Sequence, residues 1–356
     1  MRFQGPLLPT GEIADLHVRD GVIIAEPEST VLPTATGWIV PGLVDAHCHI
    51  GLDDHGAVSD DEAEAQAILD RDGGALLIRD CGSAADTSWM HDREDLPRLI
   101  RAGRHIARTR RYIRNYAQEV EPQDLVATVV AQAGRADGWV KLVGDWISRE
   151  AGDLAPSFPA KDFASAIAAA HDHGAKVTAH CFGPDVLPGL LDAGIDCIEH
   201  GTGLSADLID QMVAQGTALV PTVMQTDKFP GYAESGADKF PAYSRRMTDL
   251  YARRREVILA AHEAGVAMYA GSDGGGVARH GNLAGEILAM IDMGLPPEYA
   301  LGAASWRARD WLGWNAGLAV GDPADLVVYP RNPLDDPSVL HEPVVVVLRG
   351  KVVTRR

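Results

Sequence analysis

Short apolar runs recur between about residue 39 and residue 273, separated by longer amphipathic or alanine-rich stretches. Short runs bounded by turn residues are typical of buried strands, whereas the longer stretches favour helices. The third run is rich in arginine, and we place it mainly by the rhythm of its neighbours. The eight predicted strands are WIVPGLVDAH, GALLIRDCG, ARTRRYIRN, GWVKLVG, AKVTAH, IDCIEHG, TALVPTV and VAMYAGSD.

Two of the intervening helices are especially clear. KDFASAIAAAHDHGA starts at Lys161, consists of good helix formers and reaches Gly174, a residue type that often ends helices. DLYARRREVILAAHEAGV predicts a second helix. Because each parallel strand pair needs a crossover, eightfold alternation predicts a closed parallel (β/α)8 barrel. An open doubly wound α/β sheet remains the alternative, since alternation alone does not exclude it.

The two ends of the chain have a different pattern, with short β-like runs and turn signals. These runs are LHVRDGVIIAEPE near the start and GDPADLVVYPRNP and EPVVVVLRGKVVTRR at the finish. RDG and RGK stand at hairpin positions. Neither end has enough strands to bury a face alone, so we expect both ends to pair into one small β domain.

Composition narrows the class of protein. The 356 residues are 46% hydrophobic, as in globular proteins, and the formal net charge of −18 argues against nucleic acid or anionic membranes as partners. The N-terminus lacks a signal-peptide pattern and no apolar run could span a bilayer, so we expect a cytoplasmic protein. The four cysteines show no CxxC spacing and are predicted to be reduced and buried: Cys48, Cys81, Cys181 and Cys197.

Histidine, lysine and aspartate stand in or at the ends of the predicted strands. The active site of a parallel barrel lies at the C-terminal ends of its strands. His47 and His49 are two residues apart, so on a strand they face the same side, although an isolated HxH is more often a hydrogen-bonded pair. Convergence of several such residues favours a metal site, since buried polar groups need partners. The candidates are His47, His49, Lys141, His180, His200 and Asp273.

Lys141 lies inside WVKLV, where the sheet should be buried, in a chain with only six lysines. A buried ammonium is unfavourable unless it is neutralised or paired. An ion pair with a carboxylate such as Asp80 and a role in the metal site are equally compatible with the sequence. The RD pair Arg79 and Asp80 is interpreted as an ion pair that braces the site, with a catalytic role as the alternative.

The chain resembles the amidohydrolase superfamily, particularly its prolidase-like and imidazolonepropionase-like members. The matching segments are VPGLVDAHCH, VKLVGD, KVTAHCFG, CIEHGTGL, PTV after strand seven, AGSDGG and GLAVGDPADLVVYPRNPL. The resemblance implies a distorted TIM (β/α)8 barrel over residues 39–316. It also implies a small β-sandwich domain formed by residues 1–38 and 317–356.

The resemblance further implies two divalent metal ions, expected to be zinc, with Lys141 carboxylated and shared between them. His47, His49 and Asp273 would hold one ion, and His180 and His200 the other. A metal-bridging hydroxide would hydrolyse an amide bond, with Asp273 as general base and acid. The expected substrates are small amides such as dipeptides or N-acyl amino acids.

Further residues extend this hypothesis. Tyr232, in a polar stretch over residues 223–247 that we expect to form a loop, and His280 are candidate substrate contacts. Arginines near strand three could bind a substrate carboxylate or lie on a solvated strand.

Two other functions are compatible with the sequence. The protein could be a single-metal cyclic-amide hydrolase or deaminase, or it could be a non-catalytic scaffold. Gly183 replaces the glutamate typical of adenosine-deaminase-like relatives. Metal identity, substrate and any homo-oligomer stay open.

Overall fold

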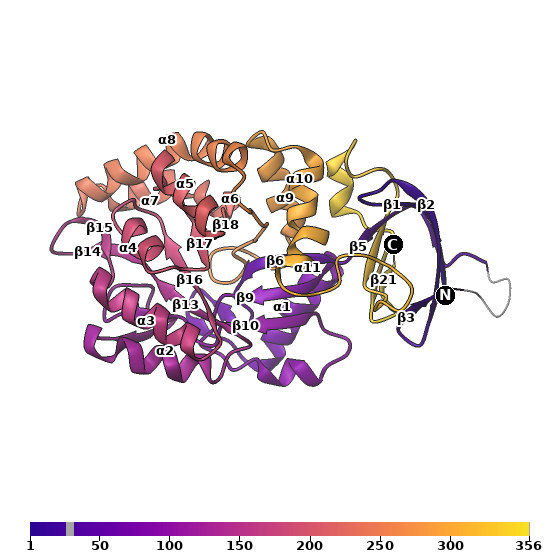
Figure 1. Ribbon diagram of the computed structural model, residues 1–356, viewed down its shortest axis with the longest axis horizontal. Coiled ribbons are helices and arrows are strands. Elements are labelled where there is room, and N and C mark those ends of the chain that lie inside the picture. Colours follow the sequence, from indigo (N-terminus) through magenta and orange to yellow (C-terminus); the bar gives the residue numbers. More distant parts are fainter. Residues whose placement is uncertain (26–31, 356) are drawn as a thin grey trace.

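A computed structural model describes residues 1–25 and 32–355. An α/β body occupies most of the molecule, and a β-sheet carries both termini at one side (Figure 1). Residues 26–28 of the first end stretch lie outside the described residues. In the described part of the chain, no helix is both long and apolar enough to cross a membrane.

The longer strand sets of the body pair in parallel, as the alternation predicted, but they form two sheets. One has the order β10-β9-β6 and the other the order β12-β11-β13-β16-β17-β18. The described strands therefore do not form one closed eight-stranded sheet. The bounds are β6 Leu43–Cys48, β9 Ala75–Asp80, β10 Arg98–Arg101, β11 Ile106–Arg108, β12 Gln118–Val120, β13 Trp139–Val143, β16 Lys176–Cys181, β17 Cys197–His200 and β18 Ala218–Val220.

Two predicted strands differ in the structure. Only the start of ARTRRYIRN is a strand, because the chain turns after β11 and Arg110 takes a φ of 60°. The eighth run, residues 266–273, forms one isolated bridge, between Met268 and Leu219, in place of a strand. It still links the sheets, since Tyr269 N donates to Leu219 O of β18 at 3.0 Å and Ala46 N of β6 donates to Ala270 O at 2.8 Å.

Helices surround these strands (Figure 1). Both sequence-predicted helices are confirmed as α3 and α8, and α8 ends before Gly265, whose φ is 90°. Residues 223–247 are largely helical, so the expected loop there is wrong. The helices are α1 Asp60–Asp72, α2 Leu125–Ala133, α3 Ala160–Asp172, α4 Leu187–Asp192, α5 Ala206–Gln215, α6 Val223–Thr226, α7 Phe229–Gly236, α8 Pro241–Ala264, α9 Leu283–Asp292, α10 Pro297–Ala303 and α11 Trp306–Trp311.

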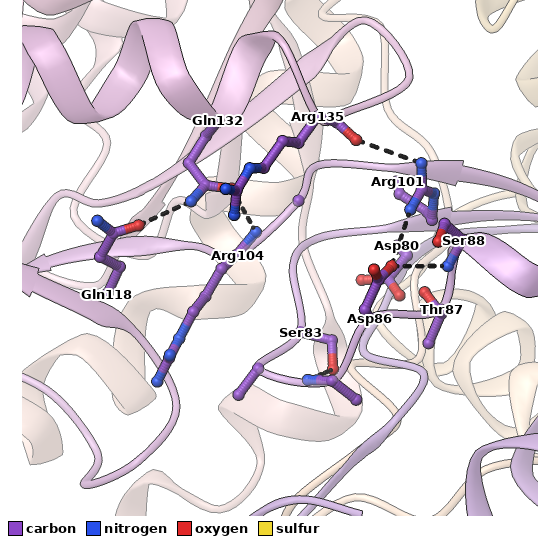
Figure 2. A pocket seen from close by; sticks show the side chains of 13 residues that line it. Asp80, Ser83, Asp86, Thr87, Ser88, Arg101, Arg104, Gln118, Gln132 and Arg135 are labelled. Carbon is purple, nitrogen blue, oxygen red and sulfur yellow. Dashed lines mark hydrogen bonds and ion pairs between the residues drawn. The ribbon is translucent and has the colours of Figure 1, made fainter. Parts of the chain in front are cut away.

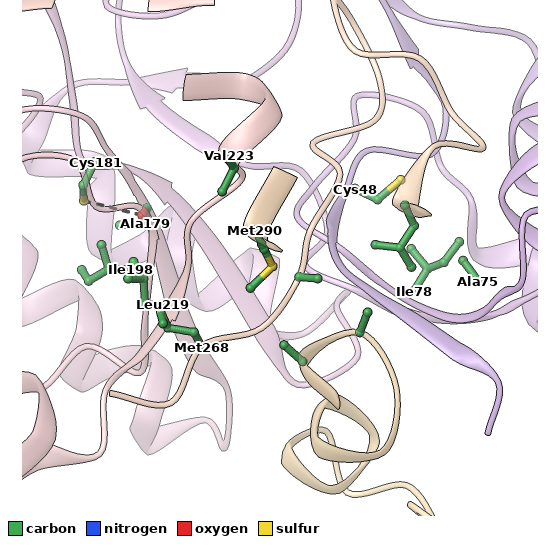
Figure 3. Packing of buried hydrophobic residues seen from close by; sticks show 14 of the residues in the cluster. Cys48, Ala75, Ile78, Ala179, Cys181, Ile198, Leu219, Val223, Met268 and Met290 are labelled. Carbon is green, nitrogen blue, oxygen red and sulfur yellow. Dashed lines mark hydrogen bonds between the residues drawn. The ribbon is translucent and has the colours of Figure 1, made fainter. Parts of the chain in front are cut away.

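One buried apolar cluster runs through the strands and helices of the body. Ile78, Ile198, Leu219, Met268 and Met290 belong to it and are completely or almost completely buried (Figure 3). All four cysteines are buried, as predicted, and free. This packing fixes the strand ends that carry the candidate site.

The terminal sheet takes strands from both ends of the chain, in the order β21-β20-β19-β5-β1-β2-β3 with β4 beside β1. The RDG and RGK hairpins are confirmed, since both central residues of each turn have positive φ. The hydrogen bonds define one sheet, so a β-sandwich is not confirmed. The strands are β1 Arg2–Leu7, β2 Glu12–Arg19, β3 Val22–Ile24, β4 Ala35–Thr36, β5 Trp38–Pro41, β19 Leu326–Tyr329, β20 Val345–Leu348 and β21 Lys351–Arg355.

Two short hairpins complete the strands of the body. They are β7 Leu52–Asp53 with β8 Gly56–Ala57, and β14 Asp145–Ser148 with β15 Asp153–Pro156. Each follows closely after a strand that contributes to the candidate site, β6 and β13 respectively. The hairpins therefore lie on the side where the parallel strands end.

Gly271 makes the close approach of the 266–274 segment to β6 possible. A Cβ atom at this position would lie 2.5 Å from His47 Cβ and 2.7 Å from Val220 Cγ1. We expect Gly271→Ala to lower the free energy of unfolding by about 1–3 kcal/mol, as overpacking does in other cores. Gly317→Ala is the matched control, because a Cβ there meets nothing within 4 Å. Equal unfolding midpoints for both variants would contradict the close packing.

Candidate active site

The six residues singled out as metal ligands meet in one cavity of about 230 Å³. They come from the ends of β6, β16 and β17, from β13 and from the segment after residue 266. Aromatic side chains and a glycine-rich turn form much of the remaining wall. The lining residues are His47, His49, Tyr112, Ile113, Tyr116, Lys141, Trp146, His180, Phe182, His200, Gln225, Tyr232, Tyr243, Asp273, Gly275, Gly276, Val277 and Ala278.

Three of these side chains form a tight group of candidate ligand atoms. His47 Nε2 lies 3.2 Å from His49 Nε2, and Asp273 Oδ1 lies 3.2 Å from the first and 3.3 Å from the second. An ion held at about 2.0–2.2 Å by nitrogen and oxygen ligands separates neighbouring ligand atoms by about 3.0–3.5 Å. The spacing in this group therefore fits one divalent ion.

The other histidines form a second group beside the first. His200 Nε2 lies 2.9 Å from His180 Nδ1, and the rings of His47 and His200 are 5.4 Å apart between centroids. Lys141 is 2% exposed, and its Nζ lies 3.5 Å from His47 Nε2. Among the described residues no carboxylate pairs with Lys141, so an ion pair with Asp80 is not the explanation for this buried amine.

Partners outside the cluster hold the imidazole rings in place. His47 Nδ1 donates to Glu199 Oε2 at 2.6 Å, and His49 Nδ1 donates to Gly82 O at 2.7 Å. A carboxylate oxygen and a carbonyl oxygen can only accept a hydrogen bond. Each imidazole therefore carries its proton on Nδ1, and its Nε2 lone pair faces the cluster. The Thr222 hydroxyl donates to Pro221 O and accepts from His200 Nδ1 at 2.5 Å, which orients His200 in the same way.

Glu199 supports the candidate ligand His47, and the sequence analysis did not identify it. It is completely buried, accepts from Arg79 NH2 at 2.8 Å and also bonds the hydroxyl of Thr178. Burial would raise the pKa of Glu199, but Arg79 and His47 hold it well below its ordinary value. The carboxylate is therefore charged and fixes His47.

Arg79 does not form the expected ion pair with Asp80. Its guanidinium packs against the rings of Trp139 and Trp311, at 4.6 and 5.1 Å from their centroids, and bonds Glu199. Asp80 Oδ1 instead accepts from Gly82 N at 2.7 Å. The brace of the site is thus Arg79–Glu199, between β9 and β17.

Three non-glycine residues of the site have left-handed backbone conformations. The φ angles are 66° at His200, 44° at Thr222 and 52° at Asp273. Such conformations cost about 1–3 kcal/mol each and cluster at functional sites. The break at His200 ends β17, so that Glu199 can bond His47 while the adjacent His200 contacts His180.

Of the two predicted substrate contacts, Tyr232 lies at the cavity and His280 does not. Tyr232 lines the cavity, and its hydroxyl accepts from Gln225 Nε2 at 3.1 Å. His280 does not line it. Its Nδ1 bonds Asp70 Oδ2 at 2.8 Å and lies 3.6 Å from the sulfur of Cys48, on the side of β6 opposite His47 and His49.

The arginine-rich stretch near strand three contributes its tyrosines to the cavity. Arg111 donates to the carbonyl oxygens of Trp146 and Ala155 at 3.1 and 2.7 Å, and therefore braces the β14–β15 hairpin. His105, which no sequence signal identified, packs edge-on against His49 and against Tyr112.

A larger cavity of about 600 Å³ lies beside the segment that follows β9 (Figure 2). Its polar groups largely satisfy one another. Arg101 contacts Asp86 and the carbonyl oxygen of Arg135, while Gln132 binds Gln118 and Arg104 N. This cavity contains none of the six candidate ligands, so the chemistry is assigned to the smaller one.

Comparison with known proteins agrees with this geometry. The model of the Amidohydrolase family matches residues 38–353. Uncharacterised proteins of Mycobacterium tuberculosis and Mycobacterium bovis are 52% identical over 355 residues, which is 99% of this chain and 95% of theirs. The chain therefore belongs to the amidohydrolase family and is a hydrolase that acts on carbon–nitrogen bonds.

Solved structures share the fold. A Xaa-Pro dipeptidase with bound methionine has a TM-score of 0.83 at 21% identity, covering 99% of this chain and 98% of the other. A prolidase complexed with N-methylphosphonate-L-proline gives 0.80 at 23%, covering 100% and 99%. The ochratoxinase of A. niger gives 0.79 at 19%, covering 99% and 96%.

Replacing Glu199 tests the support of the site. We expect Glu199→Gln to weaken metal affinity about 10- to 100-fold, because His47 loses a charged partner. The free energy of unfolding should fall by about 3–5 kcal/mol, because Arg79 loses its buried counter-charge. Calorimetric metal titration and chemical denaturation measure the two effects. The control is Glu263→Gln on the exposed face of α8. A Glu199→Gln protein with wild-type affinity would refute the role of Glu199.

Proposed function

We propose that the protein is a binuclear metal-dependent hydrolase of amide bonds in small substrates. The observation that supports this most is the convergence of two adjacent groups of ligand atoms within one cavity. In this proposal His47, His49 and Asp273 hold one divalent ion, and His180 and His200 hold the second. Nitrogen and oxygen ligands of this kind suit zinc. We regard the two parallel sheets and the linking segment 266–274 as a distorted barrel around this site.

Lys141 would complete the site as a carbamate. The neutral amine of Lys141 attacks carbon dioxide, a nitrogen–carbon bond forms and one proton leaves, which gives a carboxylate at the end of the side chain. Its burial, its lack of a carboxylate partner among the described residues and its 3.5 Å contact with His47 Nε2 support this modification. The carbamate would lie between the two groups of ligands.

Divalent ions held there would activate water and polarise the scissile carbonyl group. Asp273 is placed to move protons, because its carboxylate faces the cavity and is 13% exposed. Like most carboxylates, that of Asp273 is ionised at neutral pH, so it can accept a proton. Asp273 then returns that proton to the leaving amine, and Tyr232 contacts the substrate from the wall of the cavity.

The cavity itself restricts the substrate. Its volume of about 230 Å³ suits a compact molecule, and its wall contains Tyr112, Tyr116, Trp146, Phe182, Tyr232 and Tyr243. An apolar side chain packs well against such rings. Structural neighbours named as a Xaa-Pro dipeptidase and a prolidase support the same class. We therefore propose dipeptides or N-acyl amino acids with apolar side chains as substrates.

Substitution of Lys141 tests the proposed function. We expect Lys141→Ala to lose at least about 1,000-fold in kcat/KM on the best amide found in a screen of dipeptides and N-acyl amino acids. A short carboxylic acid such as propionate should restore part of the activity, because it can occupy the place of the carbamate. Lys176→Ala, at an exposed position of β16, is the control.

The outcomes separate the competing mechanisms. Full turnover by Lys141→Ala would show that no carbamate is needed. Activity confined to lactams and other cyclic amides would favour the single-metal alternative. A wild-type protein that is loaded with metal and hydrolyses no amide in the screen would contradict the proposed function.

A further inference from the structure

Thr222 precedes the short helix α6 but does not cap it with its side chain. A threonine at this position normally accepts a hydrogen bond from a backbone N–H group of the first helical turn. The Thr222 hydroxyl makes no such bond to α6, whose residues the structure describes in full. It accepts from His200 Nδ1 at 2.5 Å and donates to Pro221 O at 2.8 Å. The hydroxyl therefore supports the candidate ligand His200 and not the helix.

Glu286 caps α6 from another part of the chain. Its Oε1 accepts from Val223 N at 2.6 Å, and its Oε2 accepts from Met224 N at 2.9 Å. The next two N–H groups of the helix donate to Thr222 O at 2.9 and 3.1 Å. The first four N–H groups of a helix have no partner within it, and here all four are satisfied. Glu286 thus supplies the cap that the Thr222 side chain does not.

The carboxyl group of Glu286 lies in an environment that disfavours it. Glu286 is completely buried on α9, which lies beside α6 (Figure 1). Val223 of α6 and Met290 of α9 belong to the same buried apolar cluster (Figure 3). Burial raises the pKa of Glu286 to about 8, although its bonds to the two N–H groups lower it. An apolar residue in this place would leave both N–H groups without a partner, which is also unfavourable.

We propose that Glu286 is a positioning residue for the second group of candidate ligands. By capping α6 it leaves the Thr222 hydroxyl available to hold His200, whose Nε2 lies 2.9 Å from His180 Nδ1. Without the carboxylate, N–H groups at the start of α6 compete for that hydroxyl, and His200 loses its fixed orientation. This inference rests on the proposed binuclear site and names a residue that controls one of its two ions.

Glu286→Gln tests this proposal, because glutamine keeps the shape but has one acceptor oxygen and places a donor against an N–H group. Zinc is titrated by calorimetry into metal-free protein at pH 8.5, above the pKa of about 8 of Glu286. We expect the variant to bind one ion as the wild type does and the second ion about 10- to 100-fold more weakly. The control is Asp292→Asn, at an exposed position of the same helix, which should match the wild type.

Thr222→Val separates this role from general support of the fold. The substitution removes the hydroxyl and should weaken the same ion. Adding Glu286→Gln to it should cause little further loss, because both changes break one series of contacts. The proposal is overturned if Glu286→Gln keeps both affinities, weakens both ions equally, or multiplies the loss caused by Thr222→Val.

Two measurements on metal-free protein keep the outcomes distinct. In Thr222→Val, which leaves Glu286 in place, the amide protons of Val223 and Met224 should exchange with solvent as slowly as in the wild type. Faster exchange would show that Thr222 supplies the cap. NMR should find the His200 proton on Nδ1 in the wild type and partly on Nε2 in Glu286→Gln, and an unchanged proton position would also contradict the proposal. If these results hold but the wild type binds only one zinc ion, Glu286 positions His200 and the binuclear proposal fails.

Discussion

The buried contact between Arg79 and Glu199 is the interaction on which the rest of the site depends. Glu199 joins four strands, because its carboxylate bonds Arg79 of β9, Thr178 of β16 and His47 of β6 while belonging to β17. Burying the two charges is tolerable only because they pair and because aromatic rings flank Arg79. This constraint holds His47 at a fixed distance from the other candidate ligands.

Strained backbone conformations also help to position the candidate ligands, in addition to the Arg79–Glu199 ion pair. Left-handed conformations at His200, Thr222 and Asp273 interrupt the extended backbone, and the side chains of His200 and Asp273 line one cavity. Packing must compensate for that strain, and the apolar cluster around Ile198, Leu219 and Met268 supplies it (Figure 3). The fold thus stabilises a geometry that the isolated segments would not adopt.

Much of this arrangement was predictable from the sequence, for physical reasons. His47, His49, His180, His200 and Asp273 stand where apolar runs end, and parallel strands bring such ends together. Glu199 was not predictable in the same way, because strict alternation would place it on the face opposite His200. Alternation fails there since His200 leaves the extended conformation.

Other differences also have local causes. The arginine-rich third run stops being a strand after Arg108, where the chain turns and Arg111 binds backbone carbonyls of another hairpin. Residues 223–247 contain glycine and proline, yet they form helices because Pro230 and Pro241 occupy first turns, where proline is tolerated. The terminal sheet depends on pairing between residues more than 280 apart, as in Val328 with Ile39. The sequence predicted that the two ends pair, but local patterns do not determine the order of the strands or whether they form one sheet or two.

The most direct test of the two-metal account is the metal content of the purified protein. The chain would be saturated with zinc, dialysed against metal-free buffer and analysed for metal and protein together. Two groups of ligands that each hold an ion predict a ratio of about two zinc ions per chain. A ratio of about one, or a folded protein that retains none, would contradict the account.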